Sequence, residues 1–314
     1  MLDARCSILA EQRGSRIEDR GAMQTKRQIQ QLLASAGLSP NKRLGQHFLI
    51  DLNLMRLLVD SANIARDDMV LEVGCGTGSL TEASAERAGR VVAVELDRNL
   101  FGIAQTQLAA IDNVEVMNTD VLESKHVLSG RVLEALSLAR KECSGRLLLV
   151  ANLPYNVASP VIMNLVSGPT VADGMYITVQ KEVARRMAAG PGSGDYGTLS
   201  IYLSATGDSK VIRTLGPAVF WPPPRVESAM VSFVRRREKV SRIASMALFG
   251  EVVHLFMGHR RKTLLACTKL ARERLAAVAN WPKVFEQCSI EPTKRPEQLP
   301  AEDYIAIANC AGNS

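Results

Sequence analysis

The sequence predicts an α/β protein with a mostly parallel sheet covered by helices on both faces, followed by a smaller basic α-helical domain. Between residues 69 and 180, short apolar runs of strand length alternate with segments of helix length, which is the pattern of such a sheet. After about residue 240 the pattern is helical throughout. The 314 residues are enough for two modest domains with real hydrophobic cores.

Five apolar runs are the expected parallel strands: MVLEV (69–73), RVVAVEL (90–96), VEVM (114–117), RLLLVAN (146–152) and MYITVQ (175–180). Segments 81–88 and 99–110 between them are expected to be helices. Two later β-like runs, at 209–215 and 228–236, are joined by a proline-rich segment that is too short for a crossover helix. We therefore expect these two runs to pair antiparallel at one edge of the sheet.

The first 22 residues are polar, mixed in charge and without clear periodicity, which predicts a disordered leader. A helical pattern opens at Met23 and ends at Gly37, and Met23 rather than Met1 is expected to be the true start. The expected division of the chain is a leader over 1–22, an α/β domain over 23–238 and a helical domain over 239–314.

Composition excludes several classes of protein. No window approaches 18 consecutive apolar residues, so no membrane span is expected, and early acidic residues argue against a secretory signal. The six cysteines form no CxxC pair, which favours free thiols in a reducing compartment over a zinc site. We therefore expect a cytoplasmic protein.

The positive charge is concentrated at the C-terminal end. Residues 235–314 contain 14 Lys and Arg against 8 Asp and Glu, which accounts for the whole formal net charge of +6. Such asymmetry is typical of a protein that binds a polyanion. A solvated helical surface that happens to be basic explains the charge equally well.

A glycine-rich turn, Gly74-Cys75-Gly76-Thr77-Gly78, follows the first expected strand. Its third glycine comes one residue earlier than in the dinucleotide fingerprint GxGxxG, which disfavours a nicotinamide dehydrogenase, and the chain lacks a P-loop. Glu95 ends the second strand, where a carboxylate can accept hydrogen bonds from both ribose hydroxyls. Asp120 follows the third strand and can accept from an adenine amino group or cap a helix. Together they predict a nucleoside site without a phosphate cradle, which fits S-adenosylmethionine.

The fourth strand ends in Asn152-Leu153-Pro154-Tyr155, an Asn-x-Pro-Tyr motif characteristic of enzymes that methylate exocyclic amino groups of bases. The Asn152 side-chain oxygen and the backbone carbonyl of Leu153 or Pro154 can each accept one N–H of such a group, which frees the nitrogen lone pair. Pro154 stiffens the turn, and Tyr155 offers a face for a flipped base. Positioning then supplies most of the rate, and no metal is required.

The sequence resembles the ribosomal RNA adenine dimethylase family over roughly residues 40–314. The segments that carry the resemblance are NKRLGQHFLID (41–51), EVGCGTGSLT (72–81), VELD (94–97), NLPYN (152–156), QKEVARRMAAGPGSGDYGTLS (180–200), FWPPPRVESAMV (220–231) and HRRKT (259–263). The resemblance implies a Rossmann-like class I methyltransferase domain and a monomer. It also implies N6,N6-dimethylation of two adjacent adenosines in a hairpin near the 3′ end of 16S rRNA, within the immature 30S subunit. S-adenosylhomocysteine would be the second product.

The family's functional residues carry over by position. Cofactor contacts are expected at His47, Leu49, Gly74, Gly76, Glu95, Asp120 and Asn152, and the catalytic set at Asn152, Leu153, Pro154, Tyr155 and Phe220. Phe220 is expected to flank the flipped adenine. Two positions depart from the commonest pattern: His47 stands where asparagine is usual, and Cys75 where proline often follows the first glycine.

Basic residues near these motifs are candidates for phosphate contacts: Lys42, Arg43, Arg235, Arg236, Arg237, Arg260, Arg261 and Lys262. A solvated charged face is the simpler explanation for any one cluster. Two other functions remain open, namely a relative that methylates a 23S rRNA adenine and confers antibiotic resistance, and a ribosome assembly factor without catalysis. The NLPYN motif, the FWPPPRVESA segment and the long basic C-terminal domain favour the small-subunit enzyme over the 23S relative.

Overall fold

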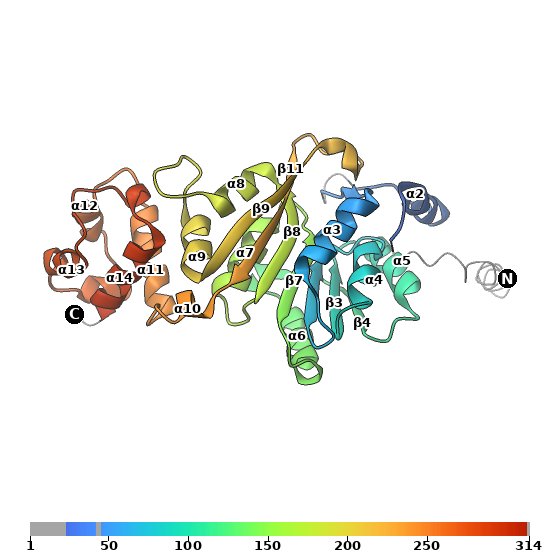
Figure 1. Cartoon of the computed structure of the whole chain (residues 1–314), viewed down its shortest axis with the longest axis horizontal. Helices are drawn as coiled ribbons and strands as arrows, with labels where there is room; N and C mark the ends of the chain where they lie inside the picture. Colours follow the sequence, from blue (N-terminus) through green and yellow to red (C-terminus); the bar gives the residue numbers. More distant parts are fainter. Residues whose placement is uncertain (1–22, 42–44, 313–314) are drawn as a thin grey trace.

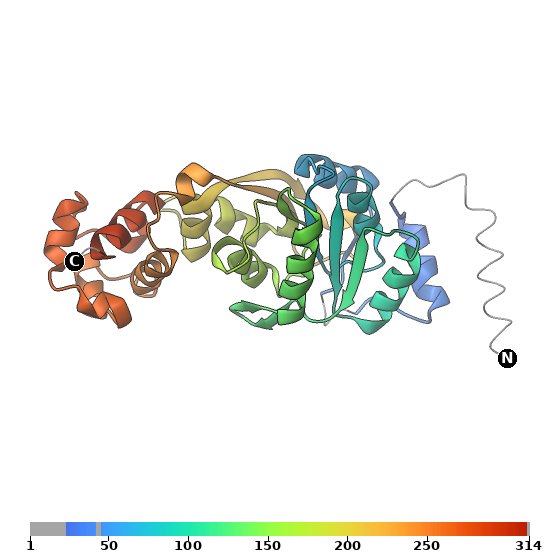
Figure 2. The same cartoon turned by 90° about the horizontal axis from the view of Figure 1, so that it is seen from below.

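The computed structural model describes residues 23–41 and 45–312. The molecule is elongated, with a twisted sheet between helical layers at one end and a group of C-terminal helices at the other (Figures 1 and 2). The expected leader (1–22) and the candidates Lys42 and Arg43 lie outside the described residues.

The central sheet has seven strands in the order β4-β3-β2-β7-β8-β11-β9. The first five of these strands are parallel, whereas β11 runs antiparallel to both β8 and β9. The predicted fold class and the antiparallel pairing at the sheet edge are therefore confirmed. The strands are β2 (Met69–Val73), β3 (Arg90–Glu95), β4 (Val114–Asn118), β7 (Leu147–Asn152), β8 (Gly174–Gln180), β9 (Gly207–Leu215) and β11 (Ser228–Arg235).

Two small sheets, which the sequence patterns did not predict, lie beside the central one. β1 (Phe48–Leu49) pairs with β10 (Phe220–Trp221), and β5 (Leu122–Ser124) forms a hairpin with β6 (Val127–Leu128). The pairs are too short to produce a periodic signal. The first of them joins segments more than 170 residues apart and brings the chain before α3 next to the proline-rich loop.

Helices cover both faces of the central sheet. One face packs against α3 (Leu52–Ala62), α4 (Ser79–Ala85) and α5 (Arg98–Leu108). The other packs against α6 (Gly130–Glu142), α7 (Ala158–Ser167), α8 (Lys181–Ala188) and α9 (Thr198–Thr206). Asp51 and Asp97 cap α3 and α5, since each side chain accepts two backbone N–H groups. α2 (Lys26–Ser35) lies over the carboxyl ends of the strands.

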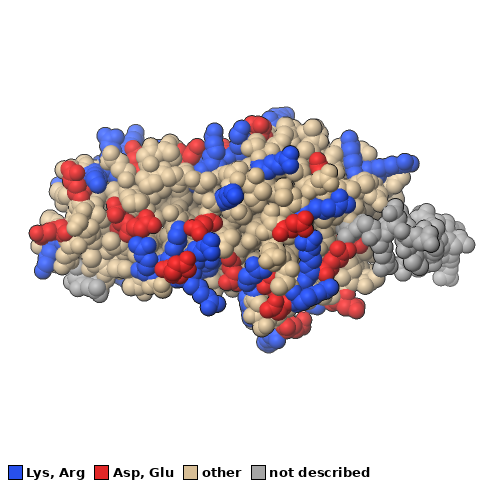
Figure 3. All heavy atoms as spheres, viewed as in Figure 1, with Lys and Arg blue, Asp and Glu red and all other residues tan. Residues whose placement is uncertain are grey.

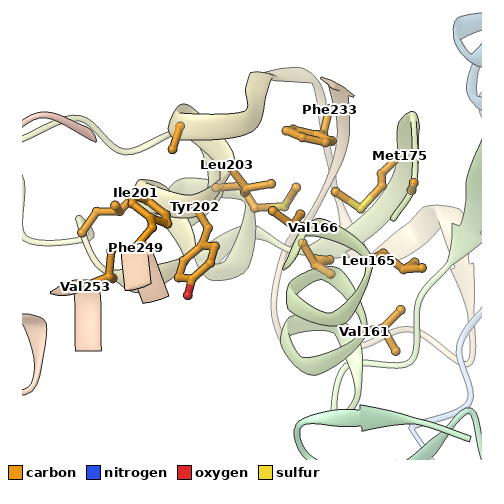
Figure 4. Close-up of a cluster of buried hydrophobic side chains, with 14 of the residues drawn as sticks. Val161, Leu165, Val166, Met175, Ile201, Tyr202, Leu203, Phe233, Phe249 and Val253 are labelled. Atoms are coloured by element: carbon orange, nitrogen blue, oxygen red, sulfur yellow. The ribbon is translucent and has the colours of Figure 1, made fainter. Parts of the chain in front are cut away.

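The C-terminal helices pack end-on against the α/β layers. They are α11 (Met246–Met257), α12 (Leu264–Thr268), α13 (Trp281–Gln287) and α14 (Ala301–Gly312), with short helices α10 (Arg237–Val240), η3 (Glu273–Ala277) and η4 (Pro296–Gln298) in the connections. A further short helix, η2 (Pro217–Val219), lies between β9 and β10. Figure 4 shows Tyr202 of α9 beside Phe249 of α11, and their rings meet edge to face at 5.2 Å. One buried cluster thus runs from the sheet into the C-terminal helices.

No helix among the described residues is long and apolar enough to cross a membrane.

Candidate active site

A cavity of about 1120 Å³, its open mouth included, lies at the carboxyl ends of β2, β3, β4 and β7. The order of the strands reverses at this point: β3 and β4 lie on one side of β2, whereas β7 and β8 lie on the other side. Such a switch point is where open α/β sheets bind ligands. The predicted site residues that line the cavity are His47, Leu49, Gly74, Gly76, Glu95, Asp120, Asn152, Leu153, Pro154 and Tyr155.

The glycine turn requires glycine at the positions where it is closest to its neighbours. Gly74 and Gly76 have φ values of 77° and 59°, which side chains rarely adopt. A Cβ at Gly74 would lie 2.8 Å from Pro154 Cγ, and one at Gly76 would lie 3.0 Å from Phe48 Cε1. The turn therefore exposes bare backbone to the cavity, wedged between two other segments of the site.

Gln24, which the sequence patterns did not single out, ties the N-terminal segment to this turn. Its side chain forms a reciprocal pair with Thr77: Nε2 donates to the Thr77 carbonyl at 3.1 Å, and Thr77 Oγ1 donates to Oε1 at 2.6 Å. The Gln24 backbone N–H also donates to Ser79 Oγ at 2.8 Å. This anchor places α2 over the cavity, where Ile29 forms part of the wall.

Two buried carboxyl groups lie below the turn. Glu95 accepts the N–H of Gly76 at 2.8 Å and that of Asp97 at 2.9 Å, one on each oxygen. Burial raises the pKa of Glu95, and these hydrogen bonds oppose the shift. Glu72 accepts from Thr81 Oγ1 at 2.6 Å, and burial, with a smaller contribution from the Glu95 charge, raises its pKa to about 8. Glu95 keeps free acceptor capacity on both oxygens, as ribose recognition requires.

Asp120 caps no helix. Its Oδ1 accepts the Leu122 N–H at 2.9 Å at the start of the β5–β6 hairpin, and its side chain lies at the cavity wall. The half-exposed apolar side chain of Leu96 lines the same region. A carboxylate beside an apolar wall suits a planar base that carries an amino group.

Asn152 is held in one orientation. Its Nδ2 donates to the His47 carbonyl at 2.7 Å, and its Oδ1 accepts from the Thr178 hydroxyl. Reversing the amide would place its oxygen against the His47 carbonyl oxygen, so this pair of contacts fixes which atom points where. The side-chain oxygen retains one lone pair. Thr178, on the neighbouring strand β8, is a site residue that sequence reasoning missed.

The Tyr155 side chain is held by a hydrogen bond at its hydroxyl and by a stacked ring on one face. Its hydroxyl lies 2.7 Å from Ser228 Oγ at the start of β11, and burial raises its pKa. The His47 ring stacks on Tyr155 with centroids 5.5 Å apart. His47 Nδ1 in turn donates to the Pro222 carbonyl at 2.7 Å. The proline-rich loop therefore reaches the site through Ser228 and Pro222.

The structure does not bring Phe220 to the cavity. Its side chain is 2% exposed and packs in the cluster below α3, where β10 pairs with Leu49 of β1. Its neighbour Trp221 faces the other way and stacks on Phe48 at 6.2 Å. As placed, Phe220 supports the strand pair and offers no free face to a base, because that short pairing directs its ring inward.

The RNA candidates among the described residues differ in what they contact. Arg235 is half-buried and donates to the Val166 carbonyl at 2.9 Å, whereas Arg236 pairs with Asp208 at 2.7 Å. Arg237 is exposed. Arg260, Arg261 and Lys262 are exposed near the end of α11, and Arg260 approaches Glu297 at 3.7 Å. Arg235, Arg236 and Arg237 are therefore in three different environments and do not form one surface patch.

Comparison with known proteins agrees with this geometry. Residues 37–311 match the model of the family described as ribosomal RNA adenine dimethylase. Proteins named ribosomal RNA small subunit methyltransferase A are 39% identical in Alkaliphilus oremlandii (86% of this chain, 91% of that protein) and 34% identical in Geobacillus sp. strain WCH70 (91% and 96%).

Two solved structures share the fold. A dimethyladenosine transferase from Plasmodium falciparum superposes with a TM-score of 0.68 at 23% identity, covering 85% of this chain and 98% of that one. The 23S rRNA methyltransferase ErmE gives a TM-score of 0.60 at 22% identity, covering 84% and 99%. The family match spans the sheet, the cavity and the C-terminal helices, so this chain belongs to the ribosomal RNA adenine dimethylase family.

Proposed function

We propose that the protein transfers methyl groups from S-adenosylmethionine to the N6 amino groups of two adjacent adenosines near the 3′ end of 16S rRNA, in the immature 30S subunit. The observation that carries the proposal is the fixed Asn152 amide in the wall of the cavity at the carboxyl ends of the strands. The names of the small-subunit relatives, which match over most of this chain, support the choice of RNA.

The residues present fit S-adenosylmethionine. Glu95 would accept the ribose hydroxyls, Asp120 the adenine amino group, and the bare backbone of the glycine turn would contact the methionine part. When bound, the cofactor supplies an electrophilic methyl group. The chain supplies the site that holds it, with Ile29 of α2 in the wall and Gln24 anchoring the glycine turn.

The target amino group would be held by two acceptors. One is Asn152 Oδ1; the other is the carbonyl of Leu153, which has no hydrogen-bond donor among the described residues, whereas the Pro154 carbonyl accepts from Val157 at 3.2 Å. Two accepted hydrogen bonds draw the nitrogen towards tetrahedral geometry and expose its lone pair. The base would stack on the face of Tyr155 that His47 leaves free, so catalysis comes mainly from orientation.

The test is methyl transfer to 30S subunits that lack these methyl groups, with labelled S-adenosylmethionine. After RNA digestion we expect the label in N6,N6-dimethyladenosine near the 16S 3′ end. Asn152→Ala should lower the rate at least 100-fold, while Asn99→Ala, on the exposed side of α5, should leave it unchanged. Label in 23S rRNA, or equal rates for both variants, would contradict the proposal.

A further inference from the structure

The edge strand β9 carries a β-bulge that changes where its cations point. Arg213 pairs with Met230 and Lys210 with Ser232, and the register shifts between Met230 and Val231. Residues three apart on a regular strand lie on opposite faces. Because Ile212 is the extra residue here, Arg213 and Lys210 lie on the same face, and bulges commonly redirect side chains in this way.

That face is the side of the sheet on which α3 packs, and Ile212 and Leu215 of β9 join the cluster beneath α3 while Lys210 and Arg213 stay exposed. The helix contacts β8, β7 and β11, and in Figure 1 β11 and β9 lie uncovered beside it. The helices α8 and α9 cover β9 from the opposite face. Lys210 and Arg213 are both exposed, and neither has an ion-pair partner in the described part of the chain.

More positive charge continues this surface towards the C-terminal helices. Arg236 and Lys239 share one carboxylate, Asp208, at 2.7 and 2.9 Å, so this group carries one net positive charge. Lys239 Nζ also donates to the Ser204 and Gly207 carbonyls, and Arg236 is the more exposed of the two cations. In Figure 3 isolated Lys and Arg side chains lie over β9, and more of them, interspersed with Asp and Glu, lie near α10 on the same face of the molecule. We call these four cations (Arg213, Lys210, Arg236 and Lys239) the β9 track.

The track starts close to the reaction centre. Leu215, at the end of β9, pairs with Ser228, whose hydroxyl meets Tyr155 at 2.7 Å. Arg213 lies two residues back from Leu215, about 7 Å along the strand. Lys210 pairs with Ser232, two positions along β11 from the partner of Arg213. The two cations are therefore spaced about 7 Å apart along the sheet. This spacing equals about two nucleotide rises of 3.4 Å.

Resting on the function proposed above, we propose that the β9 track is a docking surface for the phosphate backbone of the substrate RNA, leading from the active-site mouth to the C-terminal helices. The partner is a polyanionic strand, because the track presents positive charge. Phosphate contacts of this type set the register of the RNA and leave the choice of base to the cavity.

The experiment measures equilibrium binding to unmethylated 30S subunits as a function of salt, independently of methyl transfer. For K210Q/R213Q we expect about tenfold weaker binding near 100 mM salt, and a plot of log affinity against log salt that is shallower by one to two units. The matched control is R66Q/K141Q. It removes the same charge from exposed positions that precede the central strands β2 and β7, away from β9, and should bind like the unmodified protein.

Methyl transfer gives a second readout. At saturating 30S subunits K210Q/R213Q should keep its kcat while KM for the subunits rises, since neither residue touches the cavity. Binding and salt slope equal to those of the control would overturn the proposal. Self-association of the variant with unchanged 30S binding of its monomer would also overturn it, and would identify the two cations as guards of an edge strand.

Failure of the proposed function looks different. In that case the unmodified protein would transfer no methyl group to 16S rRNA. The binding comparison between K210Q/R213Q and R66Q/K141Q would still decide whether the track holds RNA.

Discussion

The polar groups of the cavity and those of the β9 track differ in what already binds them. In the cavity, Asn152, Tyr155 and Glu95 each have fixed protein partners, so their free acceptors point in defined directions. On the track, Arg236 and Lys239 are held by Asp208, but Lys210 and Arg213 have no such partners among the described residues. A preorganised site concentrates its effect in a few residues, whereas surface charge spreads its effect over many and loses it to salt.

After the loss of Asn152 itself, the largest effect should follow from removing the partner that orients it. Thr178→Val keeps the shape of a buried side chain and deletes the hydroxyl. We expect kcat to fall 10- to 100-fold or so while cofactor affinity is retained, because a misplaced acceptor costs orientation rather than binding. Single-turnover methyl transfer and calorimetric cofactor binding would measure the two quantities. Thr178→Ser should restore the rate; a Thr178→Val enzyme as fast as the unmodified one would show that the amide needs no second anchor.

The next effect concerns the cofactor side of the cavity. Gln24→Ala removes both side-chain hydrogen bonds to Thr77, so we expect affinity for S-adenosylmethionine to fall roughly tenfold. Gln31→Ala, on the exposed side of α2, serves as the control. If both variants bind the cofactor equally well in a titration, the anchor has no part in holding the glycine turn.

A smaller effect is expected in stability and its dependence on pH. The pKa of Glu72 is about 8 in the folded protein, against 4.5 ordinarily. The folded state therefore holds a proton that the unfolded state has lost between these values. Stability from this group is complete below pH 4.5 and is lost as pH rises towards 8.

Glu72→Gln keeps an acceptor for Thr81 and cannot ionise. Without cofactor we expect this variant to melt several degrees above the unmodified protein at pH 8.5, with the difference vanishing near pH 5. Melting curves at the two pH values measure this. A constant difference across the range would mean that Glu72 does not titrate in that window.

The smallest effects separate two neighbouring arginines. Arg237→Gln should leave the melting temperature unchanged and reduce the salt slope of 30S binding by roughly one. Arg235→Gln should instead lower the melting temperature by a few degrees, because the buried Val166 carbonyl loses its donor. If Arg235→Gln altered only RNA binding, the assignment of a structural role to Arg235 would be wrong.

The sequence by itself determined the parallel strands, the glycine turn and the Asn-x-Pro-Tyr motif. Each depends on local signals: apolar runs of strand length, backbone conformations open only to glycine, and a short motif at a strand end. From the order of these signals it also followed that Glu95, Asp120 and Asn152 share one edge of the sheet, because parallel strands present their carboxyl ends together.

Only the tertiary structure decided which side chains orient the motif and which cations are free. Thr178 reaches Asn152 from the neighbouring strand, and Gln24 reaches Thr77 across 53 residues; no local pattern encodes either contact. Phe220 is buried because β10 pairs with β1, and Arg213 joins Lys210 because a bulge shifts the register of β9. The physical reason is the same in each case: a side chain's role depends on pairing and packing between segments that are distant in the chain.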